Sequence, residues 1–171
     1  MIKTHELLRH FQSIALQRDG FGSVAPPVND FGKDSKRARK MNGLRARVWN
    51  MALAHADGDV DLEVGSDFWE NSICYENRCK EGVKTVKVPA GTMQTLFKLT
   101  GQKVNTLIID IEGAEQFIDF NQVPEEINKI IIELHPNVIG QEVTYNIVAT
   151  LISLGFRVAR EENDTFVFLR K

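Results

Sequence analysis

The feature that most constrains this chain is a short apolar stretch that ends in acids. Leu107 to Ile111 is rich in β-branched residues, contains Asp110 near its end, and is followed by Glu112. A continuous apolar run of this length is too short for a buried helix and is typical of a strand covered on both faces, as in a parallel sheet. Ligands of open α/β sheets lie beyond the carboxyl ends of such strands, so these acids indicate a site.

A second stretch repeats the arrangement. Ile130 to Leu134 is apolar apart from Glu133, and His135 and Pro136 follow it. Proline lacks the N–H donor that a central strand needs, so the strand is expected to end there. If the two strands are parallel neighbours, their polar residues meet at one edge of the sheet. The sequence therefore predicts a carboxylate-rich site with one histidine, formed by Asp110, Glu112, Glu133 and His135.

Length and charge restrict the class of protein. The 171 residues suffice for one domain with one substantial core. The formal charge of −2 gives no global reason to expect nucleic acid or an anionic membrane as a partner. No apolar run approaches the roughly 20 residues that span a bilayer, and the amino terminus lacks the apolar core of a signal peptide. We therefore expect a cytoplasmic protein without a membrane partner.

Residues 1–40 are expected to form a segment of their own. Thr4 to Asp19 has apolar residues at helical spacing and predicts an amphipathic helix that ends at Asp19-Gly20. Residues 20–32 lack periodicity and are expected to form a loop. Lys33 to Lys40 is a basic segment with helical character, and its charges suit either a solvated helix face or contact with a phosphate or polyanion.

Residues 41–171 are expected to form one globular α/β unit. Strands are predicted at 45–53, 59–64, 83–88, 107–111 and 130–135, with Asp57-Gly58 as a hairpin turn. Helices are predicted after the cap Thr92, after Gly113, and from Gln141 to Leu154. Strands 156–160 and 165–170 are expected to close the chain as an antiparallel hairpin. This order predicts an α/β fold with a mostly parallel sheet, mixed edges and a carboxyl-terminal hairpin.

Residues 65–82 are expected to be a polar loop. Phe68 and Trp69 within it suit either lids on the core or contacts with a substrate. Cys74 and Cys79 are too widely spaced for a redox motif, and no second cysteine pair completes a zinc site. Two reduced thiols are expected, with a disulfide or a metal role as the alternative.

The motif Ile109-Asp110-Ile111-Glu112-Gly113-Ala114-Glu115 resembles the signature of the FkbM family of S-adenosylmethionine-dependent methyltransferases. Other segments of the chain resemble the family in the same order, and these are Asn42-Gly43-Leu44, Ala52-Leu53 with Asp57-Gly58, Val88-Pro89 with residues 92–96, and residues 132–136. The resemblance covers roughly residues 42 to 160, and the seven-residue motif is its most specific part.

The resemblance implies a truncated Rossmann-like fold, taken from a family whose strand order is 3-2-1-4-5-7-6. It implies S-adenosylmethionine as cofactor and methylation of a hydroxyl group on a sugar or small natural product. Asp110 and Glu112 are expected to contact the acceptor or a metal, His135 to act as base, and Glu133 to complete the catalytic group. Ala52 and Leu53, together with Asp110, are the expected cofactor contacts.

The chain also departs from the family. A glycine loop after the first strand normally lets the backbone approach the cofactor closely, and an acid ending the second strand holds the ribose. Gly20-Phe21-Gly22 is the only candidate loop and lies too close to Asn42, while Pro26-Pro27 stands where the acid is expected. The match is therefore to the carboxyl-terminal two thirds of the family. Without the first two strands, the third and fourth either pair directly or are joined by another element, such as a second copy of the chain.

Three alternatives remain open at this stage. The four site side chains suit Mg²⁺, Mn²⁺ or Fe²⁺, but nothing in the sequence fixes a ligand geometry, so no metal ligand is assigned. The chain could instead be a cofactor-less, methyltransferase-like scaffold whose uncovered apolar surface forms a homo-oligomer. A polyanion-binding module has only the basic run Lys33 to Lys40 in its support.

Overall fold

The fold is described from a computed structural model of the chain. The structure describes the backbone of residues 13–18, 21–25, 46–49, 51–63, 72–73, 84–100 and 104–171, and the side chains of 49, 51–63, 84–100 and 104–171. Several predicted features lie outside these ranges, namely the helix start at Thr4, the basic segment 33–40, Asn42-Gly43, Phe68, Trp69, Cys74 and Cys79.

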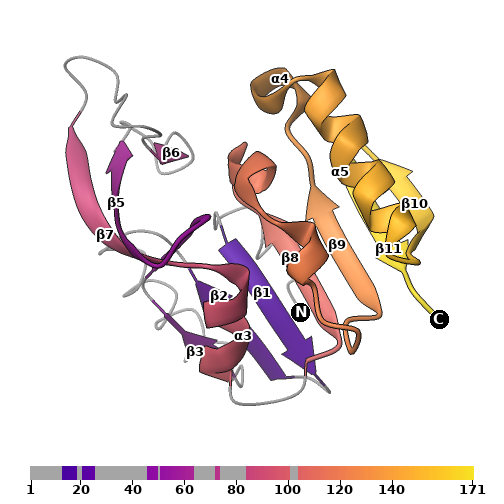
Figure 1. The fold of residues 1–171 in the computed structure, drawn as a ribbon, viewed down its shortest axis with the longest axis horizontal. Coiled ribbons are helices and arrows are strands. Elements are labelled where there is room, and N and C mark those ends of the chain that lie inside the picture. The colour runs from indigo at the N-terminus through magenta and orange to yellow at the C-terminus, as the bar shows by residue number, and fades with distance from the viewer. Residues whose placement is uncertain are drawn as a thin grey trace, which may run out of the picture.

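A seven-stranded sheet runs through the middle of the molecule (Figure 1), with strand order β10-β11-β9-β8-β1-β2-β3. Its strands are β1 (Ser13–Arg18), β2 (Phe21–Ala25), β3 (Ala46–Val48), β8 (Thr106–Asp110), β9 (Lys129–Glu133), β10 (Arg157–Glu162) and β11 (Thr165–Leu169). Within this sheet β8 and β9 are parallel neighbours, as predicted, and β2 and β3 are also parallel. All other neighbours in it are antiparallel. The prediction of a mostly parallel sheet is therefore wrong, and the chain has a mixed α/β fold.

A second, four-stranded sheet has the order β4-β7-β5-β6. Its strands are β4 (Ala52–Leu53), β5 (Gly58–Glu63), β6 (Ser72–Ile73) and β7 (Thr85–Gly91). Strand β5 confirms the strand predicted at 59–64, and it pairs antiparallel with β7. The prediction of a hairpin turn at Asp57-Gly58 is wrong, because β7 lies between β4 and β5 in the sheet. The single strand predicted at 45–53 is split, because β3 belongs to the large sheet and β4 to this one.

The first described strands replace a predicted helix and part of a predicted loop. Residues 13–18 form β1, which pairs antiparallel with β8, and residues 21–25 form β2. The apolar residues of 13–18 fit both the alternation of a strand and the spacing of a helix. Pairing with β8 selects the strand. Asp19-Gly20, interpreted as a helix stop, is equally typical of a two-residue hairpin connection, and Arg18 pairs with Phe21 on either side of it.

The helices agree with the sequence except near the site. Helix α3 (Met93–Thr100) begins after Thr92, whose Oγ1 accepts a hydrogen bond from the Thr95 N–H at 3.2 Å, as expected of a cap. Helix α5 (Gln141–Ser153) matches the long helix predicted there. The helix expected after Gly113 is instead two short 3₁₀ turns, η2 (Ala114–Phe117) and η3 (Phe120–Gln122). A short helix α4 (Pro136–Ile139) was not expected at all.

The core lies on one face of the central strands. Leu107 of β8 is opposite Ile130 of β9, which is opposite Phe168 of β11, and all three are fully buried. Each such side chain stabilises the fold by about 1.5–3 kcal/mol. Helices α3 and α5 contribute their apolar residues to the same core. Because side chains alternate along a strand, Asp110 and Glu133 lie on the other face.

The predicted terminal hairpin is confirmed. Strand β10 pairs antiparallel with β11, and the connecting residues Asn163 and Asp164 have φ angles of 48° and 62°. Asparagine and aspartate tolerate this left-handed conformation better than other side chains, which suits a two-residue turn. Strand β11 also pairs antiparallel with β9, so the hairpin extends the sheet beside the strand that leads to His135. Within the described part, no helix is long and apolar enough to cross a lipid bilayer.

Candidate functional site

A left-handed turn directs the chain at the end of β8. Strand β8 ends at Asp110, which is only 9% exposed. Glu112 then has φ 52° and Gly113 has φ 96°, and the Ala114 N–H donates to the Ile111 carbonyl at 3.2 Å. Positive φ is unfavourable for a glutamate, and such strain is concentrated at functional sites. The turn folds Glu112 back over the strand end.

Gly113 is required here for two reasons. Its φ is one that L side chains rarely adopt, and a Cβ at this position would lie 2.5 Å from Cγ1 of Val138. The turn after β8 therefore packs directly against α4, the helix that follows β9. This contact holds the two polar strand ends together.

His135 is placed by the start of α4. It stands at the N-cap position, followed by Pro136 in the first helical position, where proline suits the helix start. Its carbonyl accepts hydrogen bonds from the N–H groups of Val138 at 2.8 Å and Ile139 at 2.9 Å. The proline expected to end the strand therefore also starts a helix, and the backbone of His135 is fixed by both elements.

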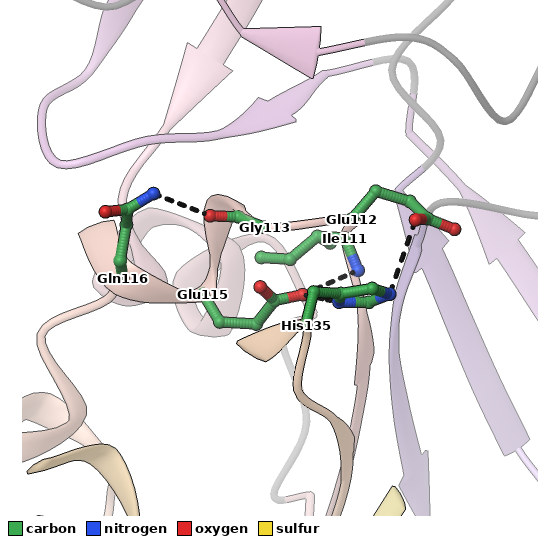
Figure 2. Close-up of polar contacts among 6 residues, drawn as sticks. All are labelled: Ile111, Glu112, Gly113, Glu115, Gln116 and His135. Carbon is green, nitrogen blue, oxygen red and sulfur yellow. Dashed lines mark hydrogen bonds and ion pairs between the residues drawn. The ribbon is translucent and has the colours of Figure 1, made fainter. Parts of the chain in front are cut away.

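The imidazole of His135 lies between two glutamates (Figure 2). Its Nε2 is 3.3 Å from Oε2 of Glu112, and its Nδ1 is 3.1 Å from Oε1 of Glu115. Glu115 is fully buried, and the same Oε1 also accepts a hydrogen bond from the Ile111 N–H at 3.3 Å. The ring is therefore held at both nitrogens, with Glu112 on the more exposed side.

Asp110 is a buried acid among other acids. Burial, together with the negative charges of Glu133 and Glu112, raises the pKa of Asp110 to about 7, against the opposing effect of the His135 charge. Burial also raises the pKa of Glu112, against the opposing effect of His135. Oδ1 of Asp110 is buried and has no hydrogen-bond partner within the described part of the chain. Asp110 is thus a carboxyl group close to the point of ionisation at neutral pH.

The surroundings of His135 favour its charged form, whereas those of Asp110 favour its neutral form. Burial lowers the pKa of its imidazole, but the hydrogen bond with Glu115 and the charges of Glu115, Glu112 and Asp110 outweigh burial and raise it to about 9. His135 is therefore a cation at neutral pH. The expected role of general base does not suit a group in this state, because a base must first be free of its proton.

The structure brings together three of the four predicted catalytic residues. Asp110, Glu112 and His135 each offer one ligand atom, and these atoms all lie within 4.8 Å of one another. Glu133 ends β9 and acts on Asp110 and Glu112 through its charge. Glu115 is a further member of the site that the sequence did not indicate. A buried glutamate needs a partner, and His135 is the cation beside it. We call Asp110, Glu112, Glu115, Glu133 and His135 the strand-end cluster.

Of the three residues expected to bind the cofactor, Asp110 belongs to this cluster, whereas Ala52 and Leu53 belong to the second sheet. Ala52 is buried in the core of the second sheet, while Leu53 lines a pocket of about 170 Å³. The pocket is also lined by Ala54, His55, Thr92, Met93, Phe117, Ile118, Asp119 and Gln122. It is smaller than the roughly 300 Å³ at which small-molecule sites begin, and Asp110 does not line it. The three residues that the resemblance assigns to the cofactor therefore do not line this pocket together.

The glycine loop candidate is also in the wrong place. Strand β1 runs antiparallel to β8, with Ser13 opposite Asp110 and Gln17 opposite Thr106. Gly22 pairs with Gln17, so it lies towards the amino end of β8, away from the strand-end cluster. A cofactor loop has to follow a strand that ends at the same edge as the site. Residues 21–22 do not meet this condition.

The fold and the cluster define a mixed α/β protein with a carboxylate–histidine site at the ends of two parallel strands. No family model matches this chain, and no curated protein or solved structure matches it either.

Proposed function

We propose that this chain is an FkbM-type methyltransferase domain and that the strand-end cluster is the acceptor half of its site. The observation that supports this most is the convergence of Asp110, Glu112 and His135 at the carboxyl ends of two parallel strands, because both strand ends lie in segments that resemble the family, the seven-residue motif and residues 132–136. The acceptor would be a hydroxyl group of a sugar or small natural product, and the methyl donor S-adenosylmethionine.

The strand order on one side of β8 supports the proposal. The neighbours β8, β9, β11 and β10 follow in the order expected for strands 4-5-7-6 of such a fold. Strand β11 is antiparallel to both of its neighbours, so β10 runs in the direction of β8 and β9. This half of the sheet places the cluster where a ligand site of an open α/β sheet is expected.

The cluster suits the acceptor because it can orient a hydroxyl and remove its proton. Oxygen methylation needs a neutral or anionic nucleophile, and a positioned base that takes the hydroxyl proton contributes substantially to the rate. The acids of the cluster are the proton acceptors, since His135 is already protonated. The His135 cation holds Glu112 and Glu115 and favours the negative charge that develops on the acceptor oxygen.

The experiment is a calorimetric titration of the purified chain with S-adenosylmethionine and S-adenosylhomocysteine, followed by a screen of hydroxylated acceptors. We expect saturable one-to-one binding in the micromolar range, and methyl transfer that is lost in Asp110→Asn but kept in Glu125→Gln, an exposed control. A folded sample that binds neither compound up to millimolar concentration would contradict the proposal for this chain.

A second function is favoured by the region beside β8. Strand β1 occupies the position where a methyltransferase has its cofactor strand, but it runs the other way. A methyltransferase-like domain without cofactor, acting as an assembly or scaffold module, is consistent with that arrangement. The mass of the same sample in solution separates the two functions, since a scaffold is expected to bind no cofactor and to form a homo-oligomer.

A further inference from the structure

The donor atoms of the strand-end cluster have the spacing of a cation site. Those of Asp110, Glu112 and His135 all lie within 4.8 Å of one another, and Nε2 of His135 is 3.3 Å from Oε2 of Glu112. Adjacent ligands of an octahedral ion with bonds of 2.0–2.1 Å are about 3 Å apart, and opposite ligands about 4 Å apart. Small side-chain rotations, together with release of the proton that the His135 cation carries on Nε2, place all three atoms on one ion.

Asp110 provides a second, independent observation. The residue is 9% exposed, and its Oδ1 is shielded from solvent with no hydrogen-bond partner within the described residues. A buried carboxylate oxygen without a donor is costly, and such atoms in folded proteins call for an explanation such as a bound ion. The carboxylate contributes one of the three donor atoms that converge here, so the unsatisfied group belongs to the cluster itself.

The orientation of His135 is a third observation. Its Nδ1 lies against the fully buried carboxylate of Glu115, which leaves Nε2 directed towards Glu112 (Figure 2). Histidine ligands of metal ions typically donate their other ring N–H to a carboxylate, which fixes the ring and its tautomer. Glu115 therefore stands in the position of a carboxylate that orients a metal ligand.

We propose that Asp110, Glu112 and His135 bind one divalent cation of the Mn²⁺ type, with Glu115 as the positioning residue for His135. Two carboxylate oxygens and one imidazole nitrogen are a mixed donor set that suits Mn²⁺ or Fe²⁺ better than Ca²⁺, which prefers oxygen alone. Glu112 is the most exposed of the three ligands, with 36% of its side chain accessible, so the ion and any hydroxylated ligand enter past it.

The inference goes beyond the proposed function, because cation binding needs neither methyl donor nor acceptor. If an acceptor hydroxyl does bind the ion, the ion lowers the pKa of that hydroxyl. Asp110 and Glu112 would then serve as ligands rather than as proton acceptors.

The test is titration of the full chain with Mn²⁺ alone after removal of metals with a chelator, followed by calorimetry and by the electron paramagnetic resonance signal of free Mn²⁺. We expect one ion per chain. Asp110→Asn and Glu112→Gln should each weaken binding at least tenfold, and Glu115→Gln by about 10–100-fold, as for other groups that orient a metal ligand. The matched control Glu125→Gln, an exposed carboxylate, should bind Mn²⁺ as the unaltered chain does.

Two results would overturn the inference. One is a folded, unaltered chain that shows no saturable Mn²⁺ binding. The other is binding that persists unchanged in Asp110→Asn and Glu112→Gln, which would place the ion elsewhere. Circular dichroism of each variant establishes that it is folded, and Asp110→Asn is expected to fold because it removes a buried charge. Failure of methyl transfer together with intact Mn²⁺ binding would count against the proposed function alone.

Discussion

At the scale of single residues, Asp110 is in a position that is unfavourable for stability. It is an acid buried beside Glu112 and Glu133, with a pKa raised to about 7. An amide of the same shape would avoid the cost of ionisation, as would an apolar residue continuing the strand. We therefore expect Asp110 to belong to a functional site, because residues of functional sites commonly lower the stability of the fold.

Asp110 should make stability fall as pH rises. Its pKa is about 7 in the folded chain against an ordinary value of 3.8, so between these values the folded state holds a proton that the unfolded state has lost. The free energy of unfolding therefore decreases from pH 4 to pH 7, by up to about 4 kcal/mol for this group. Urea denaturation of metal-free Asp110→Asn should show a smaller decrease and a more stable protein at pH 8.

The control for this prediction is Asp59→Asn, which alters an exposed acid on β5. Its pH profile should follow that of the unaltered chain. An Asp110→Asn variant that is less stable than the unaltered chain at pH 8 would show that the carboxylate is stabilised in the fold rather than strained by burial.

His135 should have the opposite pH dependence. Its folded pKa is raised to about 9 from 6.5, so its stabilising effect is complete below pH 6.5 and is lost as pH rises through about 9. His135→Ala leaves the buried charge of Glu115 without its partner and should cost about 3 kcal/mol at pH 6. The double variant with Glu115→Gln should recover part of this loss, and additive losses would contradict a direct interaction.

At the scale of elements, the sequence predicted some parts of the site well. The apolar runs of β8 and β9 could be recognised because their side chains are largely buried, and the two strands are parallel neighbours as predicted. The turn after β8 was less predictable, since a helix was expected after Gly113, where the structure has a 3₁₀ turn preceded by positive φ angles at Glu112 and Gly113. The role of Glu115 depends on a contact with His135, twenty residues away, that no local pattern contains.

The two segments that were predicted as helix and loop but form β1 and β2 share one cause. Residues 13–18 satisfy both a helical and an alternating pattern, and only the presence of β8 as a pairing partner selects the strand. Residues 21–25 contain Gly22 and Ser23, which weaken a strand signal, yet β1 and β3 flank them on both sides. Tertiary pairing thus overrides local preference where the sequence signal is weak.

The turn after β8 can be tested through Gly113. Gly113→Ala should destabilise the chain by about 2–4 kcal/mol, because it adds strain at φ 96° and an overlap with Val138. Gly155→Ala is a matched control, with φ 88° and only an ordinary contact at 3.7 Å, and should cost less. Adding Val138→Ala to Gly113→Ala should recover most of the excess, as measured by urea denaturation. No recovery would mean that the turn and α4 do not pack as described.

At the scale of the whole molecule, Arg170 joins segments that are distant in sequence. Its guanidinium donates to the carbonyls of Pro124 and Ile127 at 2.7 Å and of Leu154 at 3.2 Å, and lies 4.4 Å from the ring centre of Phe156. The end of the chain is therefore tied to the loop before β9 and to the end of α5. This places the hairpin beside the strand that carries the site.

Arg170→Lys should lower the free energy of unfolding by about 2 kcal/mol, because an ammonium group cannot reproduce the planar fork that reaches three carbonyls. The matched control is Arg157→Lys, the same substitution at an exposed position of β10 that lacks these contacts. It should have little effect on the free energy of unfolding. Equal effects of the two substitutions in urea denaturation would exclude this role for Arg170.

The most direct test of the whole account is nuclear magnetic resonance titration of the histidines in the isotopically labelled, metal-free chain. The sequence has four histidines, and the signal of His135 is identified by its loss in His135→Ala. Both proposals require β8 and β9 to hold this imidazole between Glu112 and Glu115, so we predict that it titrates at about 9. A value near 6.5, the ordinary value for histidine, would show that the strand-end cluster is not assembled and would contradict the account.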